Sequence, residues 1–166
     1  MTDNHWPTWF AAAAQPDIDQ AIAALYANLD KAVEDRSPRC DQSGRCCSFE
    51  AYGHRLYVTA LETARFLRHA PPVPQSTEPT NSLPLLHQHQ PGCRYQVDKL
   101  CTVHTIRPLG CRVYFCEPGT EAWQQDTYEH FMAQLRHLHE EHHIPYAYLE
   151  WRAALDQATQ ALSSSK

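Results

Sequence analysis

The placement of the cysteines constrains this chain more than any other feature of its sequence. Seven cysteines occur among 166 residues, which is an odd and large number for this length. They fall into two short segments, residues 40–47 and 93–116, and both segments are rich in turn residues. The cysteines are Cys40, Cys46, Cys47, Cys93, Cys101, Cys111 and Cys116. We expect a fold in which two loop regions bring these thiols together at one centre.

The ends and the hydropathy of the chain indicate a reducing compartment. Residues 1–14 lack the basic start and apolar core of a signal peptide, so we expect a cytoplasmic protein. No run of about 18 apolar residues occurs, so we expect no membrane span. Because reducing conditions disfavour structural disulfides, clustered thiols there are more often metal ligands or redox groups.

Length and composition favour one globular domain over residues 1–166. The chain is 43% hydrophobic and 20% charged, which is ordinary for a folded protein. Two halves of such a chain would each bury too little surface to be stable alone. The net charge is -5 and no basic block occurs, so we expect no nucleic-acid partner.

Hydrophobic spacing predicts a mainly helical architecture, with an α+β arrangement as the alternative. Apolar residues recur at helical spacing, and the predicted helices cover residues 17–35, 59–69, 120–142 and 147–162. Asp17 is the expected cap of the first helix, and Thr59 with Glu62 has the spacing of a capping box. The region 40–116 is the expected metal-binding part, and 117–166 is the C-terminal helical part.

The segments between these helices are expected to be short strands, turns and loops. Residues 54–58 form a candidate strand, and the cysteine segment 93–116 is expected to contain short strands, loops and one helical turn. A proline-rich stretch over residues 71–84 predicts a surface loop. The fold class is therefore a helical domain with irregular or short-strand loops that carry the cysteines.

Thiolates are soft ligands, and several together select zinc, copper(I) or iron–sulfur clusters. Zinc sites usually present paired C-x2-4-C knuckles, but here only Cys111 and Cys116 have that spacing. Cys46 and Cys47 are adjacent, and neighbouring side chains diverge in an extended backbone. One zinc ion would use four of the seven thiols, so the rest indicate a polynuclear centre, a second metal or free thiols. Buried thiols acting only as small core residues are the plain alternative.

The cysteine pattern resembles a known family. Residues 40–47 read CDQSGRCC, and the second segment contains Arg107-Pro108-x2-Cys111-Arg112 followed by Cys116. This pattern is similar to the YkgJ-type cysteine-cluster proteins, a zinc- or iron-chelating family with a CxxCxxCC signature. The resemblance covers residues 40–116 and implies a cysteine-bound metal centre. A flagellin lysine methylase is similar to this family through the same type of motif, which suggests an iron–sulfur centre.

One position departs from the signature. Ser43 stands where the second cysteine of the signature is expected, and a hydroxyl is a poor ligand for a soft metal. The departure argues against an eight-cysteine, two-site arrangement and makes Cys40 a peripheral ligand. The ranking of expected ligands is Cys47, Cys101, Cys111 and Cys116 first, then Cys46 and Cys93, then Cys40.

Other side chains near the cysteines have both functional and structural interpretations. Arg107 and Arg112 flank Cys111 and either stabilise an anionic cluster or bind loop carbonyls. His54 and His104 are more often surface or core residues than ligands. The histidine-rich stretch over residues 130–143 is expected to be a solvated helix face, with a metal-binding pair such as His139 and His142 as the alternative.

Three functions remain open from the sequence. The first is an iron–sulfur protein in electron transfer or in a modification reaction, slightly favoured by the excess of thiols. The second is a zinc module that stabilises the fold and recruits a protein or small-molecule partner. The third is metal storage or delivery. No phosphate-binding glycine loop, nucleophile elbow or C-x-x-C redox motif occurs, so the sequence does not decide whether the chain is an enzyme.

Overall fold

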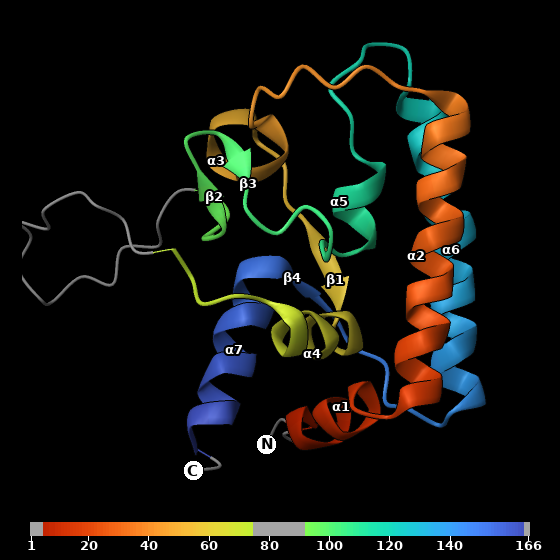
Figure 1. Cartoon of the computed structure of the whole chain (residues 1–166), viewed down its shortest axis with the longest axis vertical. Helices are drawn as coiled ribbons and strands as arrows, with labels where there is room; N and C mark the ends of the chain where they lie inside the picture. Colours follow the sequence, from red (N-terminus) through yellow and green to blue (C-terminus); the bar gives the residue numbers. More distant parts are fainter. Residues whose placement is uncertain (1–4, 75–91, 165–166) are drawn as a thin grey trace, which may run out of the picture.

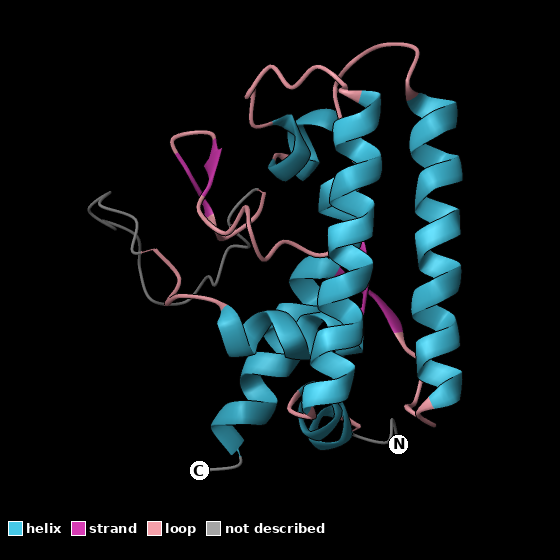
Figure 2. Ribbon diagram, turned by 45° about the vertical axis from the view of Figure 1, so that its right-hand side comes forward, coloured by secondary structure: helices cyan, strands magenta, loops and turns pink. Residues whose placement is uncertain are grey.

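Two long antiparallel helices, α2 (Pro16–Arg36) and α6 (Glu121–Glu141), lie side by side along one edge of the molecule (Figures 1 and 2). The computed structural model describes residues 5–74 and 92–164. Both helices were predicted from hydrophobic spacing, and that prediction is confirmed. The predicted cap is wrong, because α2 begins at Pro16 and no side chain caps it. Asp17 instead lies in the first turn, where its charge favours the helix dipole.

Helix α1 (Trp6–Ala13) was not predicted from the sequence. Pro7 lies in its first turn, and its buried face includes Trp6 and Trp9. This face packs on α4 (Ala60–His69), and the indole N–H of Trp9 donates a hydrogen bond to the Pro145 carbonyl at 2.7 Å. The helix was missed because eight residues with a mixed aromatic pattern give a weak periodic signal.

A two-stranded antiparallel sheet joins the middle of the chain to its C-terminal part. Strand β1 (Tyr57–Thr59) pairs with β4 (Tyr148–Glu150), and Val58 lies opposite Leu149. The predicted strand was placed slightly too early. The predicted last helix also began too early. Residues 148–150 form a strand that pairs with β1, and α7 (Trp151–Ser164) starts after them.

Helix α4 confirms the predicted capping box. The Thr59 hydroxyl accepts a hydrogen bond from the Glu62 backbone N–H, and the Glu62 carboxylate accepts one from the Thr59 N–H. Beyond this helix, residues 71–74 have no regular structure. The remainder of the predicted proline-rich loop lies outside the described residues.

The cysteine-bearing segments form small elements packed near one end of the helices (Figure 1). The first segment contains a 3-10 turn, η1 (Arg45–Cys47), followed by the short helix α3 (Phe49–Tyr52). The second contains the hairpin β2 (Gln96–Val97) and β3 (Leu100–Cys101) and then α5 (Leu109–Val113). The expectation of a mainly helical single domain with short strands and one helical turn is confirmed.

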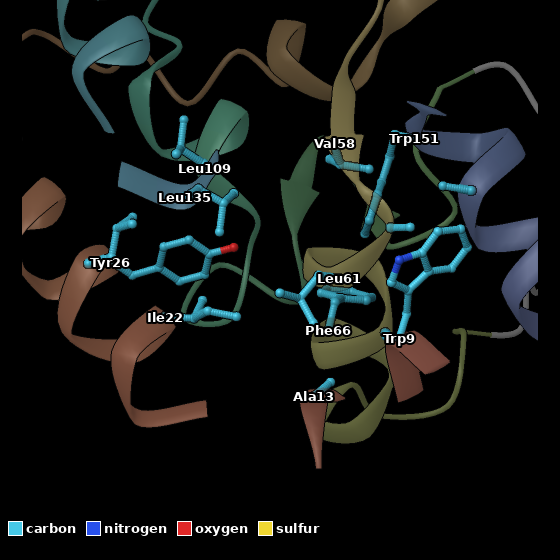
Figure 3. Packing of buried hydrophobic residues seen from close by; sticks show 14 of the residues in the cluster. Trp9, Ala13, Ile22, Tyr26, Val58, Leu61, Phe66, Leu109, Leu135 and Trp151 are labelled. Carbon is cyan, nitrogen blue, oxygen red and sulfur yellow. The ribbon is translucent and has the colours of Figure 1, made fainter. Parts of the chain in front are cut away.

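Large apolar side chains from most of the helices meet in one core (Figure 3). Leu109 of α5 lies near Leu135 of α6 and Tyr26 of α2, while Trp151 of α7 packs edge-on against Phe66 of α4 (Figure 3). The cysteine-bearing helix α5 is therefore anchored in the core. Within residues 5–74 and 92–164, no helix is both long and apolar enough to cross a bilayer.

Candidate metal centre

The turn η1 places Cys46 and Cys47 side by side at the base of the centre. Gly44 precedes the turn with φ 73°, and a Cβ there would lie 2.6 Å from the side-chain amide nitrogen of Gln96. The 3-10 backbone brings the Cys46 and Cys47 sulfurs to 3.9 Å from each other. The expectation that these side chains diverge is wrong, because it assumed an extended backbone where the chain makes a tight turn.

A backbone hydrogen bond joins the first cysteine segment to the second. The Cys93 N–H donates to the Cys47 carbonyl at 2.8 Å, across 46 positions of sequence. Gly92 makes this approach feasible: its φ is +91°, and a Cβ there would lie 2.4 Å from the Cys47 carbonyl oxygen. This hydrogen bond holds the backbones of both cysteines together without a bound ion.

The hairpin β2–β3 brings a further cysteine to the same place. Cys101 lies opposite Gln96 in the hairpin, and the Gln96 side-chain amide donates to the Gly44 carbonyl at 2.9 Å. The hairpin is thereby fastened to the loop that leads into η1. One end of the centre is thus built from residues more than 50 positions apart.

Cys111 reaches the centre from helix α5, which a buried carboxylate holds in place. Glu62 accepts a hydrogen bond from the Leu109 N–H, in the first turn of α5, at 2.9 Å. The same oxygen of Glu62 accepts one from the Tyr26 hydroxyl at 2.8 Å. The sequence indicated Glu62 only as half of a capping box and carried no signal for this second role.

The thiol of Cys47 lies at the middle of the group. Its sulfur lies 3.9 Å from that of Cys46, and interactions with the thiols of Cys101, Cys46 and Cys93 together with burial raise its pKa. The hydrogen bond from Cys47 lowers the pKa of Cys46 to about 6 and that of Cys93 to about 6. It also lowers the pKa of Cys101 to about 7. Four interacting thiols are soft donors of the kind that zinc and iron–sulfur clusters use.

Two further side chains interact with the cysteine sulfurs. The Trp151 indole N–H donates a hydrogen bond to the Cys93 sulfur at 3.4 Å. The Arg107 guanidinium interacts electrostatically with the thiols of Cys111 and Cys101, and burial lowers its own pKa. Its Nε is buried and has no hydrogen-bond partner among the described atoms. A buried guanidinium without a hydrogen-bond partner is stabilised by a nearby anion. A metal bound by four thiolates would be such an anion.

Arg112, the second candidate beside the centre, has structural partners. It binds the Asp30 carboxylate at 2.6 Å and donates to the carbonyls of Arg107 and Thr105. Its guanidinium also lies over the Tyr26 ring, 4.4 Å from the centroid. Arg112 therefore ties α5 to α2 and shapes the loop before it.

The remaining cysteines differ in their relation to the group around Cys47. Cys111 interacts electrostatically with it, because burial raises the Cys111 pKa and the charges of Cys93 and Cys101 raise it further. Cys116 instead lies 3.7 Å from the Ser43 hydroxyl, and Cys40 is exposed. The backbone hydrogen bond places Cys93 beside Cys47. The expected ranking of ligands, with Cys116 in its first group and Cys93 in its second, stays a prediction.

The cysteine sulfurs are ligands of the kind that a soft metal ion prefers. In a tetrahedron with metal–sulfur bonds of about 2.3 Å, neighbouring sulfurs lie about 3.8 Å apart. The Cys46 and Cys47 sulfurs already have this spacing, at 3.9 Å. Over the described ranges, however, no three His, Cys, Asp or Glu side chains stand as ligands around one ion. The remaining sulfurs would have to approach one another when an ion binds.

The histidines occupy other roles in the described structure. His54 stacks on Tyr114 and lies 3.4 Å from the Cys46 carbonyl, so it touches the rim of the centre. His104 is exposed. His139 is buried and packs against Tyr146, which corrects the expectation of a wholly solvated face for this part of α6.

Comparison of the chain with models of known protein families, with curated proteins and with solved structures finds no match. The likeness of residues 40–116 to the YkgJ-type pattern therefore stays a prediction. What the chain does has to be argued from its own residues.

Proposed function

We propose that this chain is a cysteine-ligated metal protein whose ligands come from both cysteine segments. The observation that carries the proposal is the position of Cys47, whose sulfur lies 3.9 Å from that of Cys46 and whose carbonyl binds the Cys93 N–H, and whose thiol interacts with those of Cys93 and Cys101. Two hydrogen bonds hold these pieces together without using the thiols themselves, one from the Cys93 N–H to the Cys47 carbonyl and one from the Gln96 side chain to the Gly44 carbonyl. A core built only to bury thiols would not need this convergence.

An iron–sulfur cluster is the favoured form of the centre. Cys111 adds a fifth sulfur to the four of Cys46, Cys47, Cys93 and Cys101, of which a cluster would use four and leave one thiol free beside it. Arg107 and the Trp151 N–H supply the positive charge and the hydrogen bond that shift the reduction potential of such clusters. This form supports electron transfer or a modification reaction, and thiols of this kind persist in a reducing compartment such as the cytoplasm.

A single zinc ion is the second candidate, favoured by the 3.9 Å spacing of the Cys46 and Cys47 sulfurs. In a four-iron cluster each thiolate binds a different iron atom, so the ligand sulfurs lie farther apart than those of one zinc ion. With zinc, the centre would contribute folding energy and fix the two loops as a module for a protein or small-molecule partner.

The test is the content of iron, acid-labile sulfide and zinc per chain in protein purified without oxygen. Iron with matching sulfide would establish the cluster. One zinc per chain without sulfide would establish the second candidate and exclude the first. A chain that binds neither metal, even after reconstitution under reducing conditions, would refute the proposal.

A further inference from the structure

A cavity of about 330 Å³ opens directly beside the cysteine group, and both Cys46 and Cys111 line it. Its other walls come from β1, the adjacent end of β4 and the first turns of α6. In Figure 1, β1 and β4 lie below α5, and α6 lies to its right. A molecule in this cavity would touch the sulfur centre without entering the core.

The walls of the cavity are dominated by aromatic rings arranged in stacked pairs. Tyr57 and Tyr148 stack with centroids 5.4 Å apart and planes 23° from parallel. His54 and Tyr114 stack at 5.0 Å and 16°. Tyr128 adds another ring, and its hydroxyl bonds that of Tyr148. Parallel rings at an open cavity favour a ligand that is itself flat, because offset stacking stabilises such contacts.

Apart from the cysteine thiols, the charged side chains that line the cavity balance each other. The described lining contains one carboxylate, Glu121, and one guanidinium, Arg55, and both residues are exposed. No other Asp, Glu, Lys or Arg belongs to that described lining. The ligand that matches this environment is therefore neutral, with substituents that hydrogen-bond to tyrosine hydroxyls.

We propose that this cavity binds a neutral, planar aromatic molecule of one or two rings against the cysteine centre. The volume lies at the lower end of small-molecule sites, which range from about 300 to 1,000 Å³, and it has room for a molecule of one or two rings. The inference does not rest on which metal the cysteines hold, since the cavity is formed by the walls described above.

The experiment titrates quinolin-2-one, a neutral bicyclic probe, into the purified protein and follows binding by calorimetry. We expect saturable binding with a sub-millimolar dissociation constant. Tyr57→Leu and Tyr148→Leu each remove one stacking surface and should weaken binding about fivefold. Tyr146→Leu is the matched control, because Tyr146 is similarly exposed and lies outside this cavity, and it should leave the affinity unchanged.

A second probe differs from the first in both planarity and charge. Decahydroquinoline has the same skeleton, but it is saturated and protonated at neutral pH, and it should bind at least about tenfold more weakly than quinolin-2-one. Saturation-transfer NMR on the unaltered protein should also show magnetisation passing from tyrosine rings to the bound quinolinone. Equal or tighter binding of decahydroquinoline would overturn the proposal, and so would unchanged affinity in both tyrosine variants. Metal content is measured in each sample, so loss of the centre is distinguished from loss of the cavity.

Discussion

The Glu62 carboxylate accepts a hydrogen bond from the Leu109 N–H at 2.9 Å, and this bond joins helix α4 to the first turn of the helix that carries Cys111. The N-terminal N–H groups of a helix have no partners within it, so a buried helix start needs an external acceptor. Glu62 also accepts from Tyr26 on α2. One carboxylate thus sets the position of α5 relative to both helices, and through α5 the position of a cysteine.

Replacing this carboxylate should loosen the centre as well as the fold. Glu62 accepts hydrogen bonds on both oxygens, from Leu109 on one side and from Thr59 on the other. Glu62→Gln leaves one accepting oxygen and turns an N–H₂ group toward a donor, at a cost of about 1–3 kcal/mol. Denaturant unfolding should show this loss, and a chelator should remove the metal faster. Glu129→Gln, on the exposed face of α6, is the control and should change neither.

The contact between the two cysteine segments depends on the absence of a side chain at Gly92. In Gly92→Ala the added Cβ would lie 2.4 Å from the Cys47 carbonyl oxygen, so the segments would have to separate. We expect a clear loss of bound metal per chain. Gly119→Ala is the control: its φ is +85°, but nothing lies within 4 Å of the added atom. It carries the same backbone strain and should keep its metal; equal losses in both variants would contradict the role given to this contact.

We expect the two arginines beside Cys111 to have different roles, an electrostatic one for Arg107 and a structural one for Arg112. Arg107→Gln removes positive charge next to the thiols of Cys111 and Cys101, so metal affinity should fall about tenfold while the fold is kept. Arg112→Gln breaks the bond to Asp30 and should instead lower the free energy of unfolding. Competition with a chelator and denaturant unfolding measure the two effects. If both variants lose affinity and stability to the same degree, the division of roles is wrong.

Acid should destabilise the fold through His139. Burial lowers the pKa of this histidine, although its hydrogen bond to the Ile144 carbonyl works in the opposite direction. The unfolded chain takes up this proton once the pH falls below about 6.5, while the folded chain resists it, so the free energy of unfolding should fall as the pH decreases from there. The slope is limited to about 1.4 kcal/mol per pH unit for one proton.

The control for this effect is His139→Phe, which packs similarly but cannot titrate. The variant differs from the unaltered protein in the pH dependence of unfolding, so metal loss in acid, which affects both, cancels in the comparison. Parallel stability curves between pH 7 and pH 5 would show that His139 does not contribute.

Sequence reasoning succeeded where the signal was local. The capping box of Thr59 and Glu62 depends on residues three positions apart, and hydrophobic spacing found α2 and α6 because each runs for 21 residues. It failed where contacts between residues distant in sequence decide the local structure. Residues 148–150 form a strand because β1 lies beside them, and the same residues alone resembled the start of α7.

In the candidate centre, too, local signals were predictable and contacts between distant residues were not. The clustering of cysteines predicted a metal site, but not which sulfurs meet. That Cys93 joins Cys47 follows from a backbone bond across 46 positions, for which the only local hint was the glycine just before Cys93. The neighbour of Cys116, Ser43, was known only as a departure from a signature.

The most direct test of the central claim compares the metal content of two serine variants prepared in the same way. Cys47 lies among the other sulfurs, whereas Cys40 is exposed and away from them. We predict that Cys47→Ser abolishes binding of the metal found in the unaltered protein and that Cys40→Ser keeps it in full. Retention of the full metal content by Cys47→Ser would contradict a centre built around this thiol.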